Sequence, residues 1–488
     1  MLKVIKNVFY QYGYQLLVMV LPLITVPYVS RVLGPNLVGT YSYTSTIVNY
    51  FVLLCMLGIN AHGSRIIARA QSREERSREF SNLFSIHLFV SLFVFVAYVG
   101  YVSLAAEEYK IILLTQGFLL VASFLDISWL YFGLEEFKLT VTRNLVVKLV
   151  TVVAIFAFVK NGDDFLLYVF LMSFGTFAGQ VALWPFVKRY VDFRRPQFRD
   201  SFLNLKPMGV LFVAVAATCI YHTIGKLFLG EMVDMSSVGY FEYADKVIQI
   251  PVAFITAFGT VMLPRMASLY ADGKVDVARR YLGVSMEAMM YVAAALCFGI
   301  IAVRIEFVEL FLGSGFAKTA DLLLLMAPSI LFIAISNVVR SQYIIPNDQD
   351  RVYVVAVLVA AILNVVMNAT LIPIIGADGA AISSTCAYVA VFLVQLVPIR
   401  AELGIVRLFK PCIFPLVVGG IALFLANLLN YASISAAVLV ITKFCLFSAV
   451  FIILSAASLR LQKRSLLRLE IKKGLASVGN RLKRERTK

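Results

Sequence analysis

Runs of about 20 apolar residues recur along the whole chain and alternate with short polar segments. A helix of about 20 residues is long enough to cross the hydrocarbon core of a bilayer. Barrel strands would alternate apolar and polar side chains, whereas both faces of most runs are apolar, so we expect helices. The pattern predicts fourteen membrane-spanning helices, near residues 10–30, 40–60, 81–103, 110–132, 143–159, 164–187, 207–227, 239–263, 281–303, 319–339, 352–372, 378–398, 411–428 and 436–457.

The composition agrees with a membrane protein. Hydrophobic residues make up 61% of the 488 residues, and charged residues make up 15%. Soluble globular domains contain about 25% charged residues, so a set of soluble domains is excluded. The formal net charge is +16, and most of the excess lies in short loops and the C-terminal tail. This placement favours lipid contact and membrane orientation over binding of nucleic acid.

The distribution of lysine and arginine predicts the orientation. With the N-terminus inside, 36 of the 44 lysines and arginines lie on the inner side, six on the outer side, and Lys246 and Lys443 within helices. Cytoplasmic loops carry such an excess, so both termini are expected in the cytoplasm. The leucine-rich and basic tail fits either an amphipathic helix on the anionic inner leaflet or a disordered topology anchor.

A weak internal repeat suggests two lobes. The segment VSRVLGPNLVGTY (29–41) is similar to IGKLFLGEMVDMSSVGY (224–240), and Gly39 and Gly239 lie 200 residues apart. Six predicted helices separate the copies, and an even number makes the halves parallel repeats. We expect two six-helix lobes around a central cavity, then two further helices and a basic tail, at residues 1–200, 201–405, 406–458 and 459–488.

A polar stripe marks the eighth predicted helix, in the segment VGYFEYADKVIQIP (238–251). Its residues follow the i, i+3, i+4, i+7 spacing of one helix face: Glu242, Asp245, Lys246 and Gln249. A charge facing lipid at the bilayer centre costs about 2.5–3.5 kcal/mol on insertion scales, so the stripe must face something else. One interpretation is a hydrated lumen; the other is a structural ion pair near the outer interface. Pro251 follows the stripe and can bend the helix.

Other polar residues lie near predicted helix ends. His62 and Arg65 follow the second helix, where they could sense protons or hold phosphate, or simply form a cytoplasmic rim. Asp126 lies in the last two turns of the fourth helix, where we expect it to bond to a neighbouring helix.

The sequence contains no motif of a metal site or an enzyme. The six cysteines lie in or beside apolar runs without a CxxC pair, which indicates reduced, buried thiols and no metal site. There is no GxSxG, Walker or HExxH motif, and no predicted outer loop could hold a domain. These features predict a transporter without a cofactor.

Four segments carry a family resemblance, and they occur in order along both halves of the chain. They resemble the polysaccharide-transport family of O-antigen and capsule repeat-unit flippases, within the multidrug/oligosaccharidyl-lipid/polysaccharide exporter superfamily. The segments are VSRVLGPNLVGTYSYTSTI (29–47), DISWLYFGLEEFKLTVTRN (126–144), VGYFEYADKVIQIPVAFITAFGTVMLPRMASLY (238–270) and GADGAAISS (376–384).

The resemblance implies a function and partners. Such proteins move an oligosaccharide linked to undecaprenyl pyrophosphate from the inner to the outer leaflet of the bacterial plasma membrane. Two lobes rock around a central cavity, with transport driven by a proton or sodium gradient, the membrane potential or product removal. Membrane lipids surround the protein, and a polymerase and a chain-length regulator of the same pathway are the expected protein partners.

The resemblance also implies the site residues. The substrate's charge and sugars would be met by Arg31, Arg65, Lys226, Glu242, Lys246 and Gln249. Coupling or gating would involve His62, Asp126, Asp245 and Pro251. This chain departs from the family at Gly225, where relatives are expected to carry an acidic residue before the lysine.

Three alternatives share parts of this picture. A drug exporter of the same superfamily would need an acidic, aromatic cavity, which the basic residues disfavour. A lipid II flippase would have the same physical requirements. A polysaccharide polymerase would need a sizeable outer loop with catalytic residues, and the predicted outer loops are short.

Overall fold

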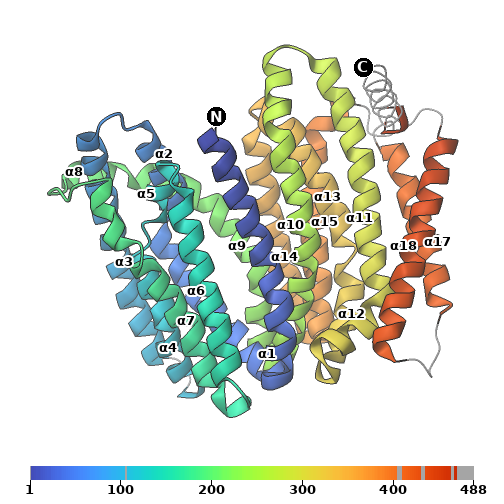
Figure 1. The fold of residues 1–488 in the computed structure, drawn as a ribbon, viewed down its shortest axis with the longest axis horizontal. Helices are drawn as coiled ribbons and strands as arrows, with labels where there is room; N and C mark the ends of the chain where they lie inside the picture. The colour runs from blue at the N-terminus through green and yellow to red at the C-terminus, as the bar shows by residue number, and fades with distance from the viewer. Residues whose placement is uncertain (1, 105–106, 404–408, 430–434, 463–466, 470–488) are drawn as a thin grey trace, which may run out of the picture. The chain divides into compact units, whose positions relative to one another are not determined.

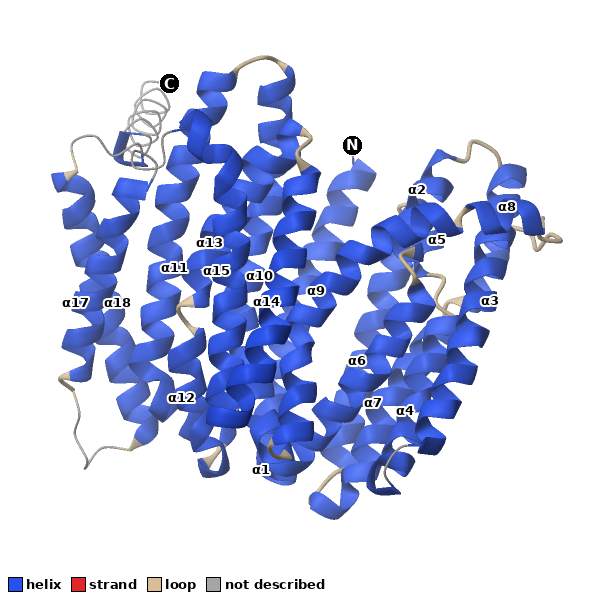
Figure 2. Ribbon diagram, turned by 180° about the vertical axis from the view of Figure 1, so that it is seen from behind, coloured by secondary structure: helices blue, strands red, loops and turns tan. Residues whose placement is uncertain are grey.

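The computed structural model describes residues 2–104, 107–403, 409–429, 435–462 and 467–469, and all of its regular elements in these ranges are helices (Figures 1 and 2). The chain divides into two compact units, residues 1–239 and 240–488. The lobe limits predicted at residues 200 and 405 stay predictions.

The helices of the first unit include one, α10, that continues into the second. They are α1 (Leu2–Met56), α2 (Ile59–Arg69), α3 (Arg73–Leu104), α4 (Glu107–Phe124), α5 (Ser128–Gly133), α6 (Phe137–Phe158), η1 (Gly162–Asp164), α7 (Phe165–Val181), η2 (Trp184–Arg189), α8 (Phe198–Leu203), α9 (Leu205–Met232) and α10 (Met235–Ala271). Within this unit α4 packs against α1, α3 and α7, and α6 packs against α7 (Figure 1).

The second unit continues with eleven described elements. They are α11 (Val275–Leu312), η3 (Ser314–Phe316), α12 (Ala317–Met326), α13 (Ser329–Val339), the π-helical turn η4 (Arg340–Ile344), η5 (Ile345–Asn347), α14 (Asp350–Ile375), α15 (Ala377–Leu403), η6 (Lys410–Cys412), α17 (Ile413–Asn427) and α18 (Ala436–Leu461). Here α14 packs along α15, and α11 packs against α13, α17 and α18.

The predicted class, an all-α polytopic membrane protein, is confirmed, but the count of fourteen helices is not. Among the described residues twelve helices are long and apolar enough to cross a membrane, and a bent pair within 200–232 raises the number to thirteen. The first two predicted spans lie together in α1, and the seventh corresponds to the bent pair, which together account for the difference. Gly34 interrupts the helical backbone of α1 with φ 71° and ψ 175°.

Gly34 and Pro35 explain this interruption. A positive φ is costly for residues with a Cβ but not for glycine. Proline has no N–H to donate and disfavours helical backbone at the residue before it. The sequence Gly-Pro therefore separates the two halves of α1, and Pro22 and Pro27 also lie within this helix.

An aromatic core at one end of the first unit fixes the short helices α2 and α5. Trp129 and Phe80 are fully buried there, with ring centroids 5.5 Å apart. Gly63 of α2 lies so close to the indole that an added Cβ would be 2.7 Å from a ring carbon. The Tyr131 hydroxyl donates to the Leu183 carbonyl at 2.7 Å, which ties α5 to the chain after α7.

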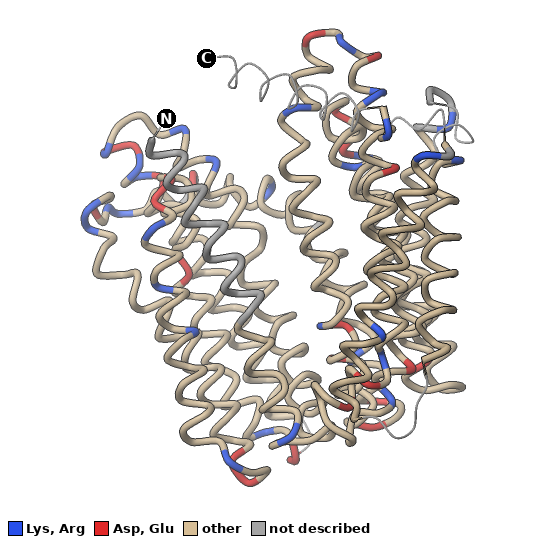
Figure 3. Tube along the Cα trace, turned by 45° about the vertical axis from the view of Figure 1, so that its right-hand side comes forward, with Lys and Arg blue, Asp and Glu red and all other residues tan. Residues whose placement is uncertain are grey.

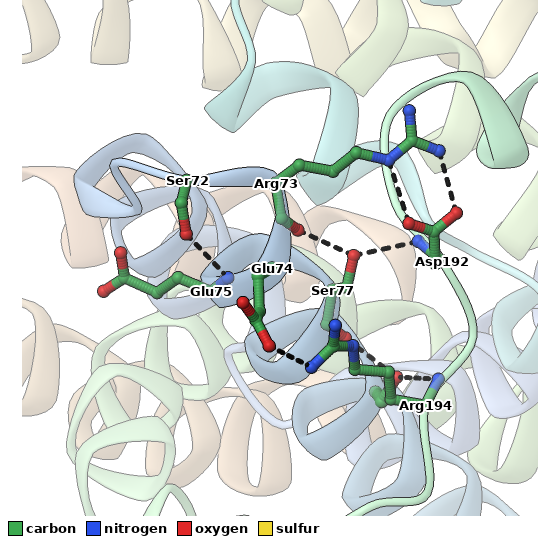
Figure 4. A network of polar contacts seen from close by, with 8 residues as sticks. Ser72, Arg73, Glu74, Glu75, Ser77, Asp192 and Arg194 are labelled. Atoms are coloured by element: carbon green, nitrogen blue, oxygen red, sulfur yellow. Dashed lines mark hydrogen bonds and ion pairs between the residues drawn. The ribbon is translucent and has the colours of Figure 1, made fainter.

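The segment before α8 is held along the start of α3 by a polar network (Figure 4). The Arg73 guanidinium donates to both carboxylate oxygens of Asp192, at 2.9 and 2.8 Å. This contact holds the pKa of the Asp192 carboxyl below its ordinary value. The backbone N–H groups of Asp192 and Arg194 donate to the Ser77 and Ser81 hydroxyls. The extended segment thus satisfies part of its backbone with side chains of α3.

The two glycines of the repeat make a reciprocal close contact within residues 1–239. A Cβ added to Gly39 would lie 1.6 Å from the Met235 carbonyl oxygen. A Cβ added to Gly239 would lie 2.1 Å from the Pro35 carbonyl oxygen. Backbones approach this closely only where side chains are absent, as at glycine-rich helix interfaces.

A buried ion pair joins α18 to α11 in the second unit. Lys443 donates to Glu306, and their side chains are 6% and 9% exposed. The same two helices share an apolar cluster with α17, to which Phe447 and Phe451 of α18 and Ala422 of α17 belong. Lys443, which the sequence predicted to lie within a helix, is therefore paired with Glu306, 137 residues earlier in the chain.

We expect Gly39→Ala to lower the free energy of unfolding by at least about 1–3 kcal/mol, because the methyl group has no space beside the Met235 carbonyl. Gly100→Ala is the matched control, since its Cβ would meet nothing within 4 Å. Thermal unfolding in detergent compares the two. Equal midpoints for both variants would contradict the close contact.

Replacing Lys443 by Met should destabilise the protein by about 3–5 kcal/mol, because a buried Glu306 loses its partner. The double change Lys443→Met with Glu306→Leu should recover most of this loss, since two apolar side chains replace the pair. The same unfolding assay measures both variants. A double variant no more stable than the single one would count against this account.

Candidate functional site

The polar stripe of α10 consists of two neighbouring side-chain pairs. Lys246 Nζ lies 2.9 Å from Glu242 Oε1, in the favourable order in which the acid precedes the lysine by four residues. Gln249 Nε2 donates to Asp245 Oδ1 at 3.2 Å. The sequence predicted a single polar face, and the helix forms it without a break, although Pro251 lies buried two residues later.

The two members of the Glu242–Lys246 pair differ in exposure. The lysine side chain is 48% exposed, and the glutamate side chain is 13% exposed. The ammonium group also lies 5.1 Å from the ring centroid of Tyr243, which is 2% exposed. The carboxylate and the ring thus support a positive charge whose outer side stays open to a further anion.

This exposure is unusual for its position, because α10 is long and apolar enough to cross a membrane. Figure 3 shows long helical stretches without Lys, Arg, Asp or Glu, with the charged positions gathered mostly towards helix ends. A half-exposed ammonium on such a helix needs water or an anionic group beside it.

Lys226 lies in a different setting, on α9 of the first unit. It is 9% exposed and close enough to Tyr50 and Cys219 for its charge to act on both side chains. The Tyr50 hydroxyl lies 2.8 Å from the Thr223 hydroxyl, which donates to the Cys219 carbonyl at 2.7 Å. Lys226 is thus part of a polar patch between α1 and α9.

The two predicted arginines lie on the surface of the first unit. Arg31 is exposed on α1, and its Nη1 donates to the Pro27 carbonyl at 2.9 Å. Arg65 is exposed on α2. Neither lies on the helix that carries Lys226, so the predicted cations of this unit are spread over three helices.

The predicted gating residues make local contacts. His62 Nε2 lies 2.8 Å from Asn204 Oδ1, which links α2 to the start of α9. We expected Asp126 to bond to a neighbouring helix, but its Oδ1 accepts from the Ser128 backbone N–H at 2.8 Å. This carboxylate therefore satisfies the backbone N–H of the first residue of α5, because an aspartate can accept from a backbone donor two residues ahead.

Sequence reasoning missed an acid at the end of α9. The Tyr43 hydroxyl donates to Glu231 Oε1, and the two residues lie 188 positions apart. Glu231 belongs to the repeat segment 224–240, and Tyr43 lies two residues after the segment 29–41, and this proximity was the available signal. Among the described residues no group of three or more His, Cys, Asp or Glu side chains could hold a metal ion.

Comparison with known proteins gives a family and a fold. The family model described as "Polysaccharide biosynthesis protein" matches residues 4–270. A Shigella dysenteriae protein named "Putative O-antigen transporter" is 24% identical over 386 residues, which cover 78% of this chain and 96% of that protein.

Two solved structures have a similar fold. The lipid II flippase MurJ in an inward closed conformation gives a TM-score of 0.77 at 13% identity, covering 94% of this chain and all of that chain. An inward-facing multidrug resistance transporter of the MATE family and MOP superfamily gives a TM-score of 0.62 at 14% identity. The match covers 79% of this chain and 95% of that chain. The chain therefore belongs to the polysaccharide biosynthesis protein family, and its fold is that of a multi-pass membrane transporter.

Proposed function

We propose that the protein is a flippase that carries an oligosaccharide linked to undecaprenyl pyrophosphate across the bacterial plasma membrane. The observation that carries this proposal is the half-exposed ammonium of Lys246 on a polar stripe of a membrane-spanning helix. The name of the Shigella dysenteriae relative and the family match support the same substrate class.

The chemistry of Lys246 suits a diphosphate. Without substrate, Glu242 offsets the cost of keeping the lysine charged within the membrane. A diphosphate carries more negative charge than one carboxylate and accepts several hydrogen bonds, so it can bind the exposed side of the ammonium. Asp245 and Gln249 lie on the same face and offer groups that hydrogen-bond to sugar hydroxyls.

The transport cycle follows from these contacts. The head group enters from the cytoplasmic side, where Arg65 adds positive charge near the entrance. Lys226 and Lys246 then bind its charge, and Arg31 adds positive charge towards the outer side. The polyprenyl chain stays in the lipid. Movement of the two lobes then exposes the head group outside, and both termini stay in the cytoplasm.

An ion gradient would bias this cycle through residues that change charge or partner. We place His62, Asp126 and Asp245 in this role, because each offers a titratable group with a hydrogen-bonded neighbour. A polymerase and a chain-length regulator would consume the product on the outer face.

A multidrug exporter is the second candidate, because the MATE transporter has a similar fold. A drug exporter would need an acidic, aromatic cavity, which the half-exposed ammonium of Lys246 disfavours. A lipid II flippase would use the same diphosphate chemistry, so it is separated from this proposal only by the sugar that is carried.

Reconstitution into liposomes tests the proposal. A fluorescent lipid-linked oligosaccharide is placed in both leaflets, and an impermeant quencher reports how much reaches the outer leaflet. We expect transfer with carriers from a polysaccharide pathway and not with lipid II or a cationic drug. Absence of transfer with every polysaccharide carrier of the host would refute the proposal.

Lys246→Met should lower the transfer rate at least about tenfold, because one charge-assisted contact to the diphosphate contributes about 1.5–3 kcal/mol. Lys246→Arg should keep most of the activity. The matched control is Lys274→Met, since Lys274 pairs with Asp272 and its side chain is 60% exposed. If the Lys246→Met variant transfers the carrier as fast as the control variant at equal protein abundance, Lys246 has only a structural role.

A further inference from the structure

Three tyrosines from three helices of the first unit gather around Glu231 at the end of α9. Tyr43 of α1 donates to the carboxylate, and its ring centroid lies 5.8 Å from that of Tyr109 of α4. The carboxylate also acts electrostatically on the hydroxyls of Tyr101, at the end of α3, and of Tyr109. We call these four residues the Glu231 cluster.

Within the Glu231 cluster, Tyr43 is the fixed member. Its side chain is buried, at 5% exposure, and its ring lies against Gly230, where an added Cβ would be 2.3 Å from a ring carbon. The hydrogen bond from this ring holds Glu231 in one orientation. A preformed acceptor of this kind costs little entropy when a ligand binds.

Two members of the cluster remain accessible. Glu231 is exposed, and its second oxygen, Oε2, has no hydrogen-bond partner among the described residues. Tyr101 is 38% exposed. Its ring packs against Phe51, with the two ring centroids 5.7 Å apart. The surface therefore presents an oriented carboxylate beside a supported aromatic ring.

The location separates this cluster from the arginine-rich end of the unit. α3 begins at Arg73, in the polar network with Asp192, and ends three residues after Tyr101. The cluster thus lies at the opposite end of α3, which is the outer end in the proposed orientation. Tyrosines are common at membrane interfaces, but a lipid-facing tyrosine does not require a carboxylate from another helix.

An aromatic ring beside a carboxylate fits a sugar. The C–H face of a pyranose packs on the ring, and two neighbouring hydroxyls donate to one carboxylate as charge-assisted hydrogen bonds. The cluster contains no cation, so it does not suit a phosphate. We infer that the Glu231 cluster is a binding site for a neutral sugar of the oligosaccharide on the outer side, which rests on the proposed function.

A binding measurement tests this inference without requiring transport. The probe is the free oligosaccharide released by mild acid from the lipid carrier of the host, titrated calorimetrically into purified full-length protein. Glu231→Gln and Tyr101→Ala should each weaken binding at least about tenfold, the cost of one lost charge-assisted bond or stacking contact. Glu107→Gln is the control, because Glu107 lies near the same end, is 86% exposed and pairs with Lys110.

Transport separates this inference from the proposed function. Glu231→Gln should slow transfer of a carrier with the complete repeat unit and leave transfer of undecaprenyl pyrophosphate bearing one sugar unchanged. If the wild-type protein transfers no carrier, the proposed function fails, whatever the binding result. If the wild type transfers the carrier but does not bind the free sugar, or if both variants bind it like the control, this inference is overturned.

Discussion

A charge within a membrane must have a partner, and this constraint explains where the charged residues of the chain lie. Lys443 and Lys246 are the two lysines predicted to lie within helices, and each pairs with a glutamate. The Lys443–Glu306 pair is nearly inaccessible, so its role is to hold α18 against α11. Lys246 leaves about half of its side chain exposed, which suits a charge that binds something from outside the protein.

The two copies of the repeat use the same framework for different chemistry. Gly39 and Gly239 supply a close backbone contact in both copies. At the 200-residue offset that relates these glycines, the charged residues of the second copy correspond to hydroxyl residues of the first: Glu242 to Ser42, Asp245 to Ser45 and Lys246 to Thr46. The contacts differ as well, because Thr46 donates to the backbone carbonyl of Ser42 at 2.7 Å, whereas Lys246 contacts the side chain of Glu242. The corresponding tyrosines also diverge, since Tyr43 binds the acid Glu231 and Tyr243 lies beside a lysine.

Local spacing made part of this structure predictable. The apolar runs predicted an all-helical membrane protein, and the i, i+4 spacing predicted that Glu242 and Lys246 form a pair. Both features depend only on residues that are neighbours along one helix. The number of spans was not recovered, because the first two predicted spans form the two halves of α1, which kinks at Gly34 without a loop between them. The contacts of Glu231 with Tyr43 and of Glu306 with Lys443 join distant helices, which one sequence does not reveal. The Ser128 contact of Asp126 was not predicted, because a carboxylate that bonds to the nearby backbone and one that bonds to another helix look alike in sequence.

The central claim is that the stripe of α10 faces water rather than lipid or protein. Cysteine labelling in intact membranes tests it, with the six natural cysteines replaced and a single cysteine introduced as Lys246→Cys or, on the same helix, as Ala244→Cys. Ala244 is fully buried and serves as the unreactive reference. We predict that a membrane-impermeant maleimide modifies the cysteine at 246 and spares the one at 244. Modification of neither until detergent is added would contradict the account.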